Sequence, residues 1–153
     1  MNPNLPLVTR RGAVLSLAAA ASSVAGLSRL LAAEHDTHRA SAALAEACAR
    51  ACADGLVECS RHVHHCAQRL AEGHREYARC LELCAACATS CAACVMACFG
   101  PASAGTAEAC ARLCEQCAAE CERFKDDEGM RTCARTCRKC AQACRSLADA
   151  GPK

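Results

Sequence analysis

The sequence has no tryptophan and few aromatic residues of any kind, with Tyr77, Phe99 and Phe124 the only ones in 153 residues. A conventional aromatic core is therefore excluded. Glycine (8) and proline (4) are also scarce, which argues against the turn-rich scaffolds that small secreted proteins staple with disulfides. The formal net charge is only +2, and without residues 1–33 fifteen basic residues face sixteen acidic ones. Such a balance gives no basic surface for nucleic acid.

Cysteine is abundant instead: the chain has 18, nearly one residue in eight. Between Cys80 and Cys98 the cysteines are spaced by 4, 3, 4, 3 and 4 residues, which are the steps of the a and d positions of a heptad. All six thiols therefore lie on one stripe of a helix that packs inward. Similar sets precede and follow, and the 18 cysteines are Cys48, Cys52, Cys59, Cys66, Cys80, Cys84, Cys87, Cys91, Cys94, Cys98, Cys110, Cys114, Cys117, Cys121, Cys133, Cys137, Cys140 and Cys144.

The helix-forming residues between the breaks predict four helices. We expect three of them at about 37–72, 75–99 and 106–124, with Thr37 and Thr106 as N-caps and Gly73 as a stop. Residues 125–129 form a turn whose acids also suit the start of the fourth helix, which runs to about residue 148. Short loops make neighbouring helices antiparallel, so the predicted fold is an all-α, antiparallel four-helix bundle with a cysteine-lined core.

Threading these helices together predicts layers of inward residues. From one end the layers are Cys48, Cys98, Cys110 and Cys144; Cys52, Cys94, Cys114 and Cys140; Gly55, Cys91, Cys117 and Cys137; Cys59, Cys87, Cys121 and Cys133; His62, Cys84, Phe124 and Met130; and finally Cys66 and Cys80. The end with His62 and Met130 mixes different soft ligands, and we interpret it as the mouth of the core. Phe99, Pro101 and Leu147 are expected to close the other end.

Residues 1–33 differ from the rest, because they contain no cysteine and no acidic residue. The pair Arg10 and Arg11 before an Ala/Leu/Ser run resembles a twin-arginine export signal, although Ala13 stands where a bulky residue is usual. We expect cleavage after Ala33, leaving a metal-binding domain of residues 34–153, export to the periplasm, and no membrane span, since the apolar run is shorter than about 20 residues. A plain N-terminal tail and a cytoplasmic location are the alternatives.

The thiol stripe points to metal binding. Disulfides do not call for a heptad repeat, and cysteines three or four apart on one helical face leave the surface in parallel, which suits a disulfide poorly. A role as small buried hydrophobes would explain one or two positions, not nearly all of them. Cu(I) prefers thiolate and accepts two or three ligands, so bridging sulfurs would give a capacity of about 18 ions. Zinc or cadmium sequestration of the metallothionein type and an iron–sulfur electron carrier remain open, although iron–sulfur cysteines lie in loops.

The Cys-x3-Cys-x2-Cys-x3-Cys helices in an all-α chain of this size, preceded by a signal, resemble the bacterial copper storage proteins over about residues 37–149. The resemblance implies multiple Cu(I) ions held by the 18 cysteine thiolates, His62 and Met130 as ligands at an open loading end, and a homotetramer. We expect no enzymatic activity, because a nucleophile needs one activated thiol and these thiols form an undifferentiated array. For His62 the alternative is a mouth residue hydrogen-bonded to a neighbour. His64 and His65 are expected on outer faces.

Overall fold

The computed structural model describes the backbone of residues 12–151 and the side chains of residues 34–151. The chain divides into two compact units, Met1–Arg39 and Ala40–Lys153. In the first unit the described backbone, from Gly12 on, is helical and belongs to α1 (Gly12–Ala71). The predicted arginine pair lies outside the described residues, and cleavage after Ala33 stays a prediction.

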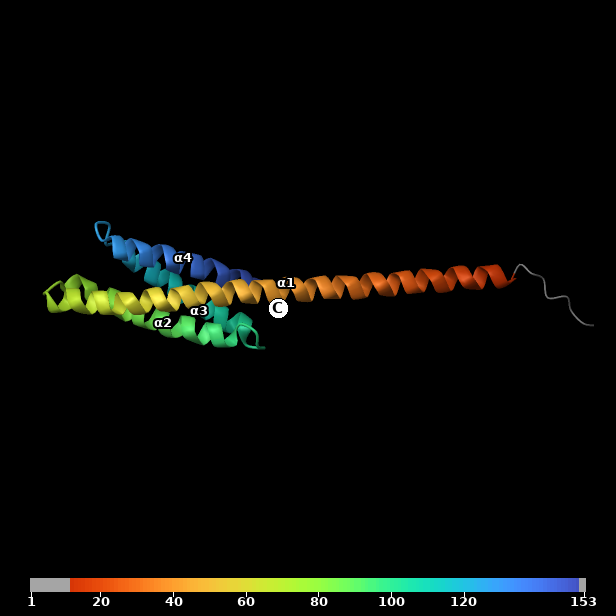
Figure 1. Cartoon of the computed structure of the whole chain (residues 1–153), viewed down its shortest axis with the longest axis horizontal. Coiled ribbons are helices and arrows are strands. Elements are labelled where there is room, and N and C mark those ends of the chain that lie inside the picture. Colours follow the sequence, from red (N-terminus) through yellow and green to blue (C-terminus); the bar gives the residue numbers. More distant parts are fainter. Residues whose placement is uncertain (1–11, 152–153) are drawn as a thin grey trace, which may run out of the picture. The chain divides into compact units, whose positions relative to one another are not determined.

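The second unit is a bundle of four helices. The rest of α1 is followed by a short 3-10 turn, η1 (Arg75–Tyr77), and by α2 (Ala78–Ala97), α3 (Ser103–Cys121) and α4 (Glu128–Asp149) (Figure 1). The connections are only a few residues long, so successive helices run antiparallel. The four-helix bundle predicted from the cysteine spacing is confirmed.

Some of the residues predicted to begin or end the helices do so in the structure, and others do not. Gly73 ends α1 as predicted, because its φ of 96° is a left-handed conformation that side chains disfavour. The acidic turn precedes α4 as expected, and Asp127 caps the helix, since its carboxylate accepts the N–H of Met130 at 3.1 Å. The two threonine caps were wrong. Thr37 lies inside α1, where its hydroxyl donates to the carbonyl of Glu34, and Thr106 lies one turn inside α3.

The core of the bundle is made of sulfur. Among the described side chains every cysteine is buried, and alanines fill most of the remaining core positions. Cysteine and alanine are both small, which lets the helices approach closely without the large aromatic residues that the sequence lacks. The stretch Arg75–Ala97 has a mean hydropathy of 1.8 and is long enough to span a membrane. Its apolarity comes largely from cysteines buried against the other helices, as in a core helix of a bundle.

One end of the bundle is covered by an aromatic pair. The ring of Tyr77 lies 4.3 Å from that of Phe124, and Met130 is fully buried. At the opposite end Leu147 is buried as predicted, but Phe99 is 69% exposed and Pro101 is exposed as well. The prediction that Phe99 and Pro101 close that end is therefore wrong. Helix α2 ends at Ala97 rather than at Phe99, so both residues belong to the surface turn that follows.

Candidate metal centre

Most of the sulfur atoms form a network through the bundle, in which contacts between sulfurs and overlapping groups of cysteines follow one another. All 18 cysteines are free thiols, and neighbouring sulfurs from different helices lie 3.4 to 4.0 Å apart. Five groups of four buried cysteines have their sulfur atoms within 4.8 Å of one another. Because several cysteines belong to two groups, the groups overlap and the network has no clear internal boundary.

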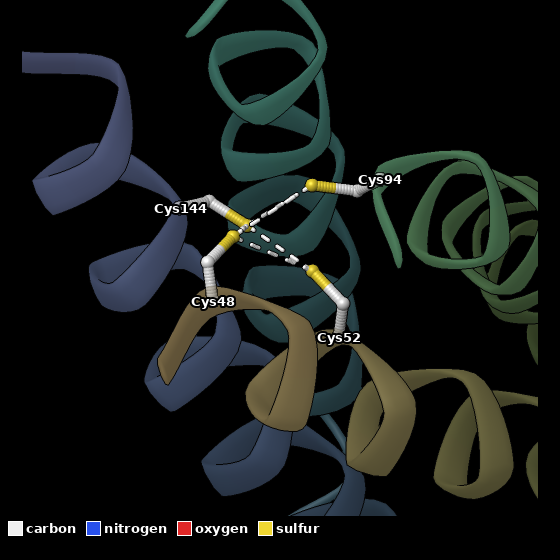
Figure 2. A group of neighbouring side chains, drawn as sticks. All are labelled: Cys48, Cys52, Cys94 and Cys144. Carbon is white, nitrogen blue, oxygen red and sulfur yellow. Dashed lines mark hydrogen bonds between the residues drawn. The ribbon is translucent and has the colours of Figure 1, made fainter. Parts of the chain in front are cut away.

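The group at one end shows how the helices build such a cluster. Cys48 and Cys52 point inward from successive turns of α1, Cys94 comes from α2 and Cys144 from α4 (Figure 2). The sulfur of Cys144 lies 3.6 Å from that of Cys48 and 3.4 Å from that of Cys52. Four sulfurs thus surround a small volume that contains no other kind of ligand atom.

The predicted layers hold between some helices and fail between others. Cys48 pairs with Cys144 and Cys52 with Cys140, as expected for α1 and α4. Between α2 and α3 the register was wrong: Cys87 was expected beside Cys121, but its sulfur lies 3.4 Å from that of Cys114.

This offset is one heptad, or about 10 Å along a helix. Cys121 pairs instead with Cys80 at 3.6 Å, and Cys84 pairs with Cys117 at 3.7 Å rather than sharing a layer with Phe124. Shifting a helix by one heptad again places cysteine against cysteine, so the repeat alone could not choose between the two registers.

Burial opposes deprotonation throughout the core and raises the pKa of some thiols, whereas hydrogen bonds from neighbouring thiols lower the pKa of others, such as Cys48. Burial raises the pKa of the Cys98 thiol to about 11, and the neighbouring sulfur of Cys48 acts in the same direction. Hydrogen bonds with the sulfurs of Cys80 and Cys84 raise the pKa of Cys66, and burial adds to the effect. A cation that binds these sulfurs must therefore displace protons.

No positive side chain balances the sulfurs from inside. Among the described residues the only buried polar or charged side chains are Glu58 and His62. Deprotonated thiolates in this core can be neutralised only by the cations that they bind, because a buried unpaired charge is costly.

The two non-cysteine residues predicted as ligands both lie at the end covered by Tyr77 and Phe124. His62 is on the inner face of α1 and 3% exposed, and its Nδ1 lies 2.9 Å from the carbonyl oxygen of Glu58. Its Nε2 faces the first turn of α4, where Met130 is buried. The structure thus brings His62 near the start of α4.

A second polar cluster at this end was not predicted as a unit. The Asp127 carboxylate lies 2.7 Å from His65 Nε2 and accepts the Tyr77 hydroxyl at 3.2 Å, in addition to capping α4. Burial alone would raise the pKa of Asp127, but the Met130 N–H, His65 and Tyr77 together lower it. His65 is only half-buried and uses one ring nitrogen here, whereas His64 is exposed as expected.

The comparisons with known proteins agree with this geometry. The family model described as copper storage protein matches residues 100–149, and no curated protein matches the chain. The apo form of copper storage protein 3 from Bacillus subtilis is 33% identical to this chain, with a TM-score of 0.59. The match covers 67% of this chain and 97% of the Bacillus chain. The structure of Cu(I)-bound BsCsp3 is also 33% identical, with a TM-score of 0.60 and coverage of 69% and 98%.

A third solved structure, a protein of Nitrosospira multiformis, is 30% identical, with a TM-score of 0.60, covering 69% of this chain and 95% of its own. The match thus covers nearly the whole length of each relative. The sequence identity of 30 to 33% supports common family membership in addition to a common fold. A sulfur-lined bundle with these relatives identifies the chain as a member of the copper storage protein family.

Proposed function

We propose that the bundle stores many Cu(I) ions by binding them to the inward-facing thiolates of its core. The observation that carries this proposal is the burial of all 18 cysteines as free thiols, most of them with a neighbouring sulfur 3.4 to 4.0 Å away. Cu(I) is a soft ion that accepts two or three thiolates, and bridging sulfurs let each cysteine serve two ions. The Cu(I)-bound relative supports the same cargo for this chain.

Charge balance favours Cu(I) over zinc or cadmium. With about one monovalent ion per thiolate the filled core is neutral. A divalent ion in a four-thiolate site leaves two net negative charges, and several such sites would accumulate charge in a core where no Lys or Arg is buried among the described residues. An iron–sulfur carrier fits less well, because every cysteine except Cys98, at the end of α2, lies on a helix rather than in a loop.

We propose that copper enters at the end that carries His62 and Met130. These are the non-cysteine soft ligands nearest the sulfur network, and His62 reaches the surface only slightly, at 3% exposure. An imidazole there can take Cu(I) from a donor before thiols such as Cys66, fully buried in the core, receive it. A storage role requires no catalysis, and we propose that the protein is not an enzyme.

Compartment and assembly are further proposals. The twin arginines, Arg10 and Arg11, support export of the folded domain to the periplasm. The exposed Val57, Met96 and Phe99 offer apolar surface for a homotetramer. Light scattering of the purified protein tests the assembly, and N-terminal sequencing of the protein recovered from the periplasm tests cleavage after Ala33.

The storage proposal is tested by titrating the reduced protein anaerobically with Cu(I) against a competing chelator. Tight uptake of well over ten ions per chain is expected. Saturation at one or two ions would contradict storage and indicate a chaperone. A parallel zinc titration separates the alternative, since four thiolates per ion limit zinc to four or five ions.

A further inference from the structure

We propose that Gly129 makes His62 a copper ligand, because its missing side chain leaves the Nε2 atom of the ring open to Cu(I). This inference rests on the storage function and the loading end proposed above. It assigns a positioning role to a residue that carries no ligand atom of its own.

The structure determines which nitrogen of His62 can bind a metal. A carbonyl oxygen only accepts hydrogen bonds, so the ring nitrogen 2.9 Å from the Glu58 carbonyl, Nδ1, must carry a proton. The carboxylate of Glu58, 3.4 Å from the same nitrogen, favours the same arrangement. A neutral ring with a proton on Nδ1 has its lone pair on Nε2, as in metal sites where a second group fixes the imidazole.

Nε2 is also the nitrogen that Cu(I) can reach. Among the described residues, none donates a hydrogen bond to Nε2. Every fully buried side-chain nitrogen or oxygen in this part of the chain has a hydrogen-bond partner, so an atom without a partner must be in contact with solvent. Nε2 must therefore account for part of the 3% of His62 that remains exposed. The ring is held by the protein at one nitrogen and is accessible at the other.

Gly129 borders this accessible atom. A Cβ added at position 129 would lie 3.1 Å from His62 Nε2 and 3.2 Å from the Asp127 carboxylate oxygen Oδ1. The backbone has little freedom to withdraw, because Asp127 caps this turn through Met130 and is itself bound to His65 and Tyr77.

Backbone conformation does not explain the glycine. Gly73 is the only described residue with a positive φ, so an alanine at position 129 would adopt the backbone without strain and would favour the helix. The space beside Nε2 is what a side chain at this position would remove.

Four variants test the assignment: Gly129→Ala, His62→Ala, the double variant, and Gly105→Ala as a matched control. Gly105 lies in the first turn of α3, and an added Cβ there would meet nothing within 4 Å. Loading is followed by stopped-flow mixing with a Cu(I)–chelator complex. We expect Gly129→Ala to slow loading severalfold, as much as His62→Ala does, while Gly105→Ala loads at the wild-type rate.

The double variant shows whether the effect passes through His62. It should load no more slowly than His62→Ala alone, and final capacity should remain within about one ion of the wild type in all four variants. Unchanged loading by Gly129→Ala would overturn the inference, and so would a further loss in the His62→Ala background. Failure of the wild type to bind more than one or two ions would instead overturn the storage function.

Nitrogen NMR of histidine in the wild-type protein provides a readout that needs no variant to fold. The apo ring of His62 should carry its proton on Nδ1, and the first equivalent of Cu(I) should shift Nε2 while Nδ1 keeps its proton. A proton on Nε2 in the apo protein, or a shift confined to Nδ1, would refute the assignment.

Discussion

Replacing Asp127 by alanine should destabilise the apo bundle, because one carboxylate joins the ends of three elements. It caps α4 through Met130, accepts the hydroxyl of Tyr77 next to α2 and binds His65 of α1. Loss of an N-cap costs about 1 kcal/mol, and the two side chains that lose their acceptor add roughly another 1 kcal/mol, since His65 is 33% exposed and can turn to water. We expect a loss of about 2 kcal/mol.

Thermal unfolding of the reduced apo protein, followed by circular dichroism, measures this loss. A domain of this size loses about 4 °C in Tm per kcal/mol, so Asp127→Ala should unfold about 8 °C lower. Asp127→Asn keeps an oxygen for the helix cap and should lose about half as much. The control is Asp126→Ala, because Asp126 is exposed and should matter by less than about 0.5 kcal/mol. Equal losses in the Asp126 and Asp127 variants would refute this account of the cluster.

The same carboxylate predicts a pH dependence. The pKa of Asp127 is lowered in the folded protein, so its contribution is complete above the unfolded value near 4 and is lost as the pH falls through the lower folded value. The difference in Tm between wild type and Asp127→Ala should therefore narrow as the pH falls below about 4. A difference that widened in acid would contradict the sign of this argument.

Further predictions concern the sulfur network and the surface. Cys52→Ala removes a sulfur 3.4 Å from that of Cys144 and should lower the Cu(I) capacity by about one ion in a chelator titration, whereas the loss of half the capacity would show that filling is all-or-none. Burial raises the pKa of Cys98 from 9.0 to about 11, so the contribution of this thiol to stability is complete below pH 9 and is lost as the pH rises to 11. Over this range the free energy of unfolding of the apo protein, measured in urea, should fall by up to about 3 kcal/mol more than that of Cys98→Ala. Arg138 lowers the pKa of Glu122 through a two-bond ion pair, but both side chains are about half exposed, so Arg138→Ala should cost less than 1 kcal/mol at neutral pH, and less still once acid protonates Glu122.

The sequence predicted the bundle and its sulfur core because both depend on local spacing. Cysteines at steps of three and four residues lie on one helical face wherever the helix is placed, so burial of all 18 followed from the pattern alone. The stop at Gly73 and the acidic turn before α4 were also readable, since both are properties of a few neighbouring residues.

Features that depend on contacts across the bundle could not be read in this way. Nothing near Thr106 shows that α3 begins a turn earlier, at Ser103, or that α2 ends early enough to expose Phe99. The cluster of His65, Tyr77 and Asp127 joins positions up to 62 residues apart. The only sign of this cluster in the sequence was that polar and aromatic residues lie close to the ends of the helices. Such residues are common at helix ends in proteins that have no such cluster.

The wrong register between α2 and α3 shows what the end cluster contributes to the fold. A sliding step of one heptad replaces one sulfur contact by another, so the cysteine core has nearly the same energy in several alignments. The groups that do not repeat are at the end of the bundle: the Tyr77 ring against Phe124, and Asp127 with its three partners. A slip of about 10 Å would break the contacts of Tyr77 with Phe124 and of Asp127 with His65 and Tyr77, whereas the cap on Met130 is local and would remain. We infer that the residues around the proposed loading end select the single alignment of the sulfur network, and that a uniform core of soft ligands can be well ordered because its specificity resides at one edge.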